Sequence, residues 1–223
     1  MSAISKFLTA TAVAGSLTFF SASAQAAVFI GTQAAGEVTV TQRATDADLA
    51  VWGGNVGGFE INTVQGVAGQ RPSPLLASGS INADRRDGTT GVLDIFVTST
   101  DIADAVSEDF LSGFTTNFLT QGWTVQLRTY VSAANELWTG QLIGDHTFTD
   151  IADASAYGAA AVGQGLYSVT HRYTITANGA GSADSTITVA AVPEPGAWAL
   201  MIMGLGGAGA MLRSRRKQGL ALA

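Results

Sequence analysis

The sequence predicts an all-β fold, an antiparallel β-sandwich of roughly eight to ten strands with room for one short helix. Two observations predict it. The 223-residue chain contains 27 glycines and no cysteine, and it is rich in the Ala, Thr, Ser and Val residues typical of exported β proteins. Between Ala27 and Val192, short apolar runs alternate with polar residues and are separated by Gly, Asn, Asp and Ser. A chain of this length favours one core, so we expect a single sandwich over residues 27–191.

Individual strands are predicted where apolar residues recur at every second position, because such a strand buries one face. Four segments of this kind are residues 37–41, 91–97, 123–131 and 166–176. The expected inner face of the last segment consists of Tyr167, Val169, His171, Tyr173 and Ile175. We expect His171 to be a buried or half-buried residue bonded to a neighbour, and we expect a final strand around Ile187 and Val189.

Residues 101–115 break the alternation. Their apolar residues recur at roughly helical spacing, and they are Ile102, Ala105, Val106, Phe110, Leu111 and Phe114. We therefore expect a short helix or a large loop in this segment.

The charge of the predicted sandwich excludes nucleic acid as a partner. Between Ala27 and Val192, six arginines and no lysine face sixteen acidic residues. Binding to a phosphate backbone relies on clustered Lys and Arg, which this segment lacks. An acidic surface suits solubility outside the cell.

The first 26 residues read as a cleaved signal peptide. Lys6 precedes an apolar stretch over residues 7–20, and Ala24 and Ala26 satisfy the small-x-small cleavage rule. We expect export through the secretion translocon and cleavage by signal peptidase after Ala26. The alternative is a retained N-terminal anchor, for which the apolar run is short.

The C-terminal segment contains a rigid turn, an apolar run and a basic cluster, in that order. Pro193, Glu194 and Pro195 precede an apolar run over residues 196–212, which contains Trp198 and is just long enough to span a membrane as a helix. The basic cluster consists of Arg213, Arg215, Arg216 and Lys217. By the positive-inside rule this cluster stays cytoplasmic, so the preceding domain lies outside the inner membrane.

This arrangement resembles the PEP-CTERM sorting signal over residues 192–217, followed here by a tail of residues 218–223. The resemblance implies that an exosortase recognises Pro193, Glu194 and Pro195 and removes the helix, after a transient stay in the inner membrane. It further implies a secreted cell-surface or extracellular-matrix protein of a Gram-negative bacterium, associated with exopolysaccharide and biofilm. An ordinary single-span anchor is the alternative, and hydropathy does not separate the two.

No motif in the sandwich predicts catalysis. Only two histidines occur, His146 and His171, without the spacing of a zinc site and without cysteine. No G-x-S-x-G nucleophile motif is present, so a hydrolase would have to assemble its partners through the fold alone. We expect no enzymatic activity and no cofactor.

Two residue types leave a binding function open. Acidic residues cluster at Asp101, Asp104, Glu108 and Asp109, which are weak candidates for calcium ligands. Acidic clusters are more often solvated surface, so we predict no firm metal site. Trp52, Trp123 and Trp138 have the chemistry of a sugar-stacking surface, but tryptophan on a strand is usually core, and we expect core for each.

The region from Phe96 onward also resembles the β-rich passenger domain found in proteins with this tail. The matching stretches are residues 98–101, 130–135 and 167–170. That resemblance implies no activity. The predicted function is a structural or interaction protein of the cell surface, with extracellular polysaccharide as a candidate partner. The alternative is a secreted glycan- or calcium-binding β-sandwich module.

Overall fold

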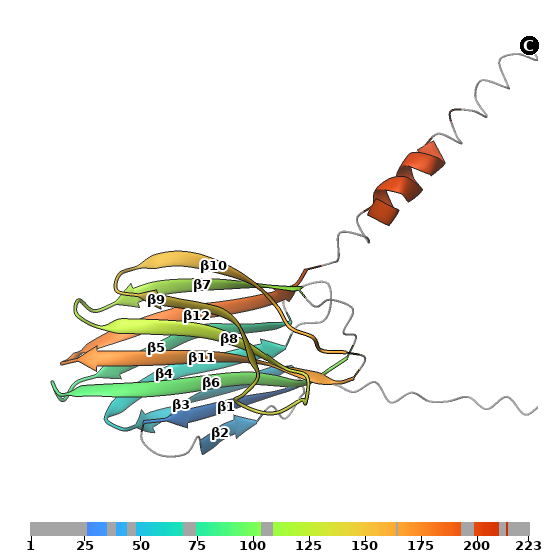
Figure 1. Ribbon diagram of the computed structural model, residues 1–223. Helices are drawn as coiled ribbons and strands as arrows, with labels where there is room; N and C mark the ends of the chain where they lie inside the picture. Colours follow the sequence, from blue (N-terminus) through green and yellow to red (C-terminus); the bar gives the residue numbers. More distant parts are fainter. Residues whose placement is uncertain are drawn as a thin grey trace, which may run out of the picture.

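The computed structural model describes residues 26–34, 39–43, 48–68, 75–103, 109–163, 165–192, 199–209 and 213. Within these residues, twelve antiparallel strands form two stacked six-stranded sheets (Figure 1). The predicted all-β sandwich is confirmed. The strand count exceeds the expected eight to ten.

The two sheets contribute one layer each. Sheet A contains, in spatial order, β2 (Thr39–Arg43), β1 (Ala27–Gln33), β6 (Thr90–Ile102), β11 (Tyr167–Asn178), β8 (Thr124–Ser132) and β9 (Gln141–Phe148). Sheet B contains β10 (Ala152–Ala159), β7 (Asp109–Leu119), β12 (Gly181–Ala191), β5 (Leu76–Arg85), β4 (Phe59–Ala68) and β3 (Leu49–Val56).

Strands β5 to β12 are wound as a jelly roll. From β5 onward the chain changes sheet at every connection except the one between β8 and β9. The resulting orders, β6-β11-β8-β9 in sheet A and β10-β7-β12-β5 in sheet B, are those of two interleaved Greek keys. The earlier pairs β1–β2 and β3–β4 extend the two sheets beyond this unit.

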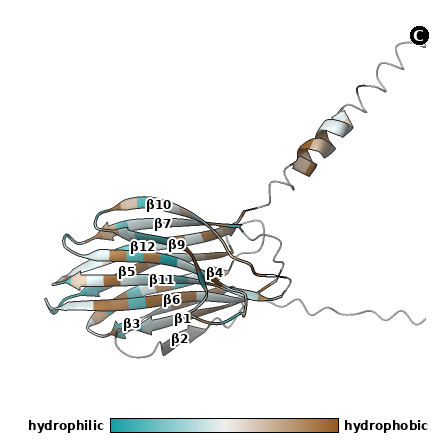
Figure 2. Ribbon diagram, in the orientation of Figure 1, coloured by the Kyte–Doolittle hydropathy of each residue, from teal (hydrophilic) through white to brown (hydrophobic). Residues whose placement is uncertain are grey.

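The alternation of apolar and polar residues places the core between the sheets. On β11, Tyr167, Val169, His171, Tyr173 and Ile175 are all at most 1% exposed, as predicted. Their neighbours on the opposing sheet include Ile187 and Val189 of β12, which are fully buried. Apolar segments therefore recur along the strands of both layers (Figure 2).

The helix or loop predicted over residues 101–115 is wrong for residues 101–102, which end β6, and for residues 109–115, which open β7. Inward-facing residues alternate on this strand, from Phe110 through Ser112 to Phe114. A separation of four residues fits both one helical turn and two strand repeats, so the pair Phe110 and Phe114 satisfies either period. Residues 104–108 lie outside the described residues.

Polar side chains link the two sheets inside the core. Ser78 of β5 lies 2.8 Å from Nδ1 of His171 and also contacts the hydroxyl of Tyr173. The Tyr173 hydroxyl accepts a hydrogen bond from the backbone N–H of Ile187 at 3.0 Å. The prediction that His171 is buried and bonded to a neighbour is confirmed.

Both ends of the sandwich segment lie at the same end of the molecule. Ala27 of β1 pairs with Thr100, whereas Ala191 of β12 pairs with Phe110. The opposite end holds the turns around Gly57, Gly88 and Gly179, each with a positive φ. Beyond β12, residues 199–209 form a short helix (Figure 1). These residues are exposed.

Among the described residues, no helix is both long and apolar enough to cross a membrane.

Candidate functional site

The sorting residues follow directly on the last strand. The backbone N–H of Val192 donates to the carbonyl oxygen of Asp109 at 2.9 Å, so the sandwich holds the chain up to the residue before Pro193. Arg213 is helical and exposed. The other predicted sorting residues lie outside the described residues, and they are Pro193, Glu194, Pro195, Trp198, Arg215 and Arg216.

The predicted signal cleavage site lies next to the first strand. Ala26 immediately precedes β1 and is partly buried against the core, whereas Ala24 lies outside the described residues. Cleavage after Ala26 would therefore leave a mature chain that starts with β1 at Ala27. Cleavage at this bond stays a prediction.

The calcium candidates are only partly placed by the structure. The carboxylate of Asp101 accepts hydrogen bonds from Asn135 at 2.8 Å and from Thr100 at 3.0 Å. Asp109 lies on β7, and Asp104 and Glu108 lie outside the described residues. Within the described ranges, no three His, Cys, Asp or Glu side chains are grouped so that they could hold a metal ion.

The three tryptophans occupy different environments. Trp123 is 1% exposed and packs edge-on against Phe59, so it is core as expected. Trp52 is partly buried against the core. Trp138 lies on the loop between β8 and β9, partly exposed and outside the core cluster, so the core prediction is wrong for this residue.

Ser78 and His171 have the spacing of a nucleophile and a base, but substrate has no access to them. Both residues are 0% exposed. Burial lowers the pKa of His171 to about 3, so the imidazole is neutral at physiological pH. Its Nε2 atom has no hydrogen-bond partner among the described residues. The pair is thus a structural contact between the sheets.

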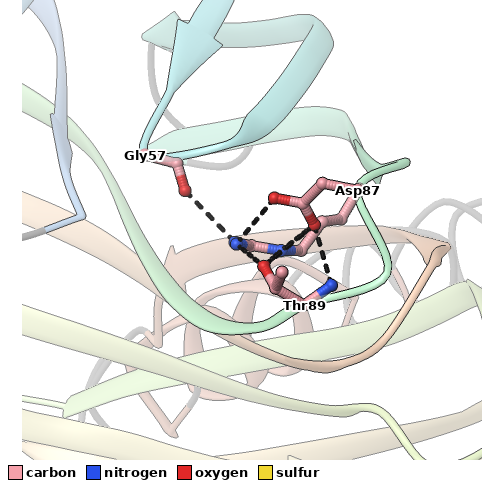
Figure 3. Close-up of polar contacts among 4 residues, drawn as sticks. Gly57, Asp87 and Thr89 are labelled. Carbon is pink, nitrogen blue, oxygen red and sulfur yellow. Dashed lines mark hydrogen bonds and ion pairs between the residues drawn. The ribbon is translucent and has the colours of Figure 1, made fainter.

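A cluster of polar contacts closes the end of the sandwich opposite the termini (Figure 3). The guanidinium of Arg85 donates from Nε and Nη2 to the carboxylate of Asp87 at 2.8 and 3.1 Å. Its Nη1 atom donates to the carbonyl oxygen of Gly57 at 3.1 Å, and its Cζ atom lies 4.8 Å from the ring centroid of Phe59. The hydrogen bond from the Thr89 amide lowers the pKa of Asp87. Arg85 therefore ties the β3–β4 turn to the β5–β6 turn.

A pocket of about 270 Å³ opens beside this cluster. Its charged lining consists of Glu60, Asp84, Arg86 and Asp87. Arg86 and Glu60 form an exposed ion pair at 3.1 Å. Exposed pairs of this kind contribute little to stability or affinity, and nothing here points to a specific ligand.

The outer face of sheet A carries two arginines, each held by a carboxylate. Arg172 of β11 and Arg128 of β8 are directly opposite each other in the strand register. Arg172 donates from Nε and Nη2 to the two carboxylate oxygens of Asp94 at 3.1 and 3.0 Å. Arg128 donates from Nε to Asp145 at 3.4 Å. The hydrogen bond with Asp94 raises the pKa of Arg172 above its ordinary value.

Two neutral side chains complete this network. The Thr174 hydroxyl donates to Asp94 at 2.5 Å, and the Gln126 amide donates to both oxygens of Asp145 at 2.9 and 3.1 Å. Arg128 also donates to the side-chain oxygen of Gln126. Every charge in the row thus has a partner in the described structure, and the side chains are held in place by one another.

An aromatic pair borders the row. The Cζ atom of Arg172 lies 5.2 Å from the ring centroid of Phe96, and the rings of Phe96 and Trp138 meet edge-on, with centroids 5.7 Å apart and an interplanar angle of 63°. Phe96 is only 4% exposed, whereas Trp138 is partly open to solvent. We call the following set the sheet A platform: Asp94, Gln126, Arg128, Trp138, Asp145, Arg172 and Thr174.

The loop that carries Trp138 is folded back onto the sheet. The Ser168 hydroxyl donates to the carbonyl oxygen of Glu136 at 2.5 Å, and the Asp101 N–H donates to the side-chain oxygen of Asn135 at 2.9 Å. Asp101, Asn135 and Trp138, with φ of 57°, 56° and 66°, are the three non-glycine residues with positive φ in the described part of the chain. Asp and Asn tolerate this conformation, but a bulky Trp does not, so strain is concentrated at Trp138.

Sequence reasoning missed the platform. Asp94 and Arg172 are 78 positions apart, and only the pairing of β6 with β11 brings them together. The one available signal was Arg172 itself, a charged residue on the outward-facing side of the predicted strand over residues 166–176.

Comparisons with known proteins give no relative in sequence, since no curated protein matches the chain. Several solved structures are weakly similar to the chain. TmCBM61 in complex with β-1,4-galactotriose is 10% identical, with 65% of this chain and 88% of that chain covered and a TM-score of 0.33. TmCBM27, a mannan-recognising carbohydrate-binding module, is 8% identical, with 63% and 86% covered and a TM-score of 0.35.

A third structure, the CBM22-1 xylan-binding domain of Paenibacillus barcinonensis Xyn10C, is 12% identical, with 73% and 94% covered and a TM-score of 0.32. Likenesses this weak carry no conclusion about a ligand.

The tail gives a specific match. Residues 191–217 match the PEP-CTERM protein-sorting motif, which begins at the last residue of β12. The motif indicates an exported protein of Gram-negative bacteria that passes through the membrane. The chain therefore carries the signal of an exosortase-sorted exported protein.

Proposed function

We propose that this protein is a non-enzymatic interaction protein that an exosortase releases from the inner membrane to the cell surface or extracellular matrix, where it associates with exopolysaccharide. The observation that carries the proposal is the PEP-CTERM match at residues 191–217, which begins at the last residue of β12. Cleavage near Pro195 would remove the apolar segment and leave all of β12 in the sandwich.

The placement of both ends supports this order of events. Ala27 and Ala191 lie at the same end of the sandwich, so a chain held by its tail presents the opposite end away from the membrane. The side chains of residues 199–209 are exposed, and they include Leu200, Met201, Ile202, Met203 and Leu205. An exposed apolar helix needs an apolar partner, which a membrane or a membrane-embedded peptidase supplies.

Cell fractionation tests the proposal. The protein is followed by immunoblot in inner-membrane, surface and medium fractions of the producing bacterium, with and without its exosortase. We expect surface or medium protein in the parent and inner-membrane protein in the deletion strain. Substitution of Pro193, Glu194 and Pro195 by alanine should reproduce the deletion phenotype.

Deletion of residues 218–223 is the matched control, because these residues follow the motif and should leave sorting unchanged. Equal distribution of the protein in both strains would refute the proposed sorting.

A further inference from the structure

The sheet A platform combines an aromatic ring with hydrogen-bonding groups of both kinds. Trp138 is partly exposed at the border of the row and meets Phe96 edge-on, and the Arg172 guanidinium lies over that same Phe96 ring. The row itself carries carboxylate acceptors on Asp94 and Asp145, whose side chains are 13% and 37% exposed, and guanidinium donors on Arg172 and Arg128, which are 29% and 25% exposed. A sugar ring has an apolar C–H face and a rim of hydroxyls that both donate and accept, which is the complementary arrangement.

The charge of the platform favours a neutral ligand. The charges of its two arginines and two aspartates balance, and each arginine is already bonded to a carboxylate. No unpaired positive charge is therefore available for an acidic group, and the chain as a whole has a formal net charge of −6. An acidic polysaccharide would be repelled by the chain, while an uncharged one would not.

The platform is also held ready for binding. Side-chain order is set by the hydrogen bonds of Thr174 to Asp94 and of Gln126 to Asp145. Trp138 is fixed in a conformation that bulky residues avoid, by a loop tied down at Ser168 and Asp101. Ordered groups lose little entropy on binding, and backbone strain in a folded protein is concentrated where a side chain is used.

The outer face of sheet B differs from the platform in the residues that the structure describes. Its outer face carries a polar ladder in which Asn62 donates to Asp84 at 3.0 Å and Asn117 donates to Asp184 at 3.0 Å. Tyr157 is 62% exposed there, but its register neighbour Leu111 also pairs with Ala190, next to the start of the sorting motif. Tyr157 therefore lies at the end of the sandwich from which the tail leaves.

We propose that the sheet A platform binds a neutral polysaccharide, with a sugar ring against Trp138 and hydroxyls bonded to Asp94 and Arg172. This inference rests on the proposed role in exopolysaccharide and names the site and the ligand class. Binding is a property of the sandwich surface, so it can be tested separately from sorting.

Affinity electrophoresis of the full chain in mild detergent tests the site. The probes are the neutral and acidic fractions of the producing bacterium's extracellular polysaccharide, separated by anion exchange and cast into the gel. We expect retardation by the neutral fraction. Trp138→Ala and Arg172→Ala should each weaken it by about tenfold or more.

Two variants on sheet B are matched controls. Tyr157→Ala removes an exposed aromatic ring and Asn117→Ala removes an exposed amide, and both should keep wild-type retardation. A far-ultraviolet circular dichroism spectrum confirms that each variant is folded. If Trp138→Ala is unfolded, Arg172→Gln serves in its place, since it keeps the stem of the side chain and loses the charged fork.

The outcomes separate this inference from the proposed function. No retardation by the neutral fraction, retardation only by the acidic fraction, or loss of binding in Tyr157→Ala but not in Arg172→Ala would each overturn the platform site. Correct sorting with no polysaccharide binding would support the proposed delivery to the surface and refute only the proposed polysaccharide binding.

Discussion

The Nδ1 atom of His171 lies 2.8 Å from the hydroxyl oxygen of Ser78, and this contact joins sheet A to sheet B inside the core. Both side chains are completely buried. Because His171 is titratable and buried, we expect the free energy of unfolding to depend on pH. Because the contact between the sheets is made by hydroxyl groups, we expect the removal of one hydroxyl to lower the stability of the sandwich.

Stability should fall in mild acid because of His171. Burial lowers its pKa from 6.5 to about 3. Above pH 6.5 the residue is neutral in both states and contributes nothing. Between pH 6.5 and about 3 the unfolded chain takes up a proton that the folded protein does not, so the free energy of unfolding falls by up to about 1.4 kcal/mol per pH unit. Urea titrations across this range measure the slope.

His171→Gln removes the titrating group and should flatten the pH dependence relative to wild type over the same range. His146→Gln is the control, because His146 is exposed and its substitution lies outside the core. Identical slopes for His171→Gln and wild type would show that His171 is not the source.

Tyr173→Phe should destabilise the sandwich. The lost hydroxyl accepts the backbone N–H of Ile187 at 3.0 Å and contacts Ser78, so both groups are left buried without this partner. We expect a loss of about 1–3 kcal/mol in the free energy of unfolding, measured by urea denaturation. Tyr157→Phe, at a position 62% exposed, should change stability by no more than about 0.5 kcal/mol. Equal effects of the two substitutions would contradict the inter-sheet role.

Strain at Trp138 predicts an unusual order of stability among its variants. At φ of 66° any residue with a Cβ atom is disfavoured, whereas glycine is not. Trp138→Gly should therefore be more stable to urea than Trp138→Ala by about 1 kcal/mol, the reverse of the usual effect of glycine in a folded segment. Should Trp138→Ala prove equal or more stable, the backbone at this position is not strained.

Arg85→Lys should loosen the end of the sandwich opposite the termini. Lysine has no planar fork for Asp87 and cannot reach the Gly57 carbonyl at the same time, so we expect a loss of about 1–3 kcal/mol in thermal or urea unfolding. Arg86→Lys is the matched control, since Arg86 is 75% exposed in its ion pair with Glu60. A loss of similar size in both variants would mean that the fork is not what stabilises the turns.

More of the fold than of the candidate site could be predicted from the sequence. Alternation identified the strands of Tyr167–Asn178 and Thr124–Ser132 because a half-buried strand repeats every two residues. It failed at Phe110 and Phe114, because a separation of four residues fits both the period of a helix and that of a strand. The platform depends on contacts such as Asp94 with Arg172, which only strand pairing across long stretches of chain creates.

The sorting tail, unlike the sheet A platform, could be predicted from the sequence alone. Its chemistry is carried by residues adjacent in sequence, from Pro193 to Lys217, so no fold was needed to read it. Residue type alone could not predict that Trp138 lies outside the core while Trp123 lies within it. The difference comes from the loop that places Trp138 against Phe96 of sheet A.

Removal of the sorting tail by an exosortase is tested by the intact mass of the mature protein. The protein is purified from the producing bacterium and from its exosortase deletion strain, and the C-terminal peptide is sequenced in each. We predict a parent chain that starts at Ala27 and ends near Pro195, and a deletion-strain chain that keeps Trp198 through Lys217. If both strains keep the tail, the protein is a membrane-anchored sandwich and the proposed sorting is wrong.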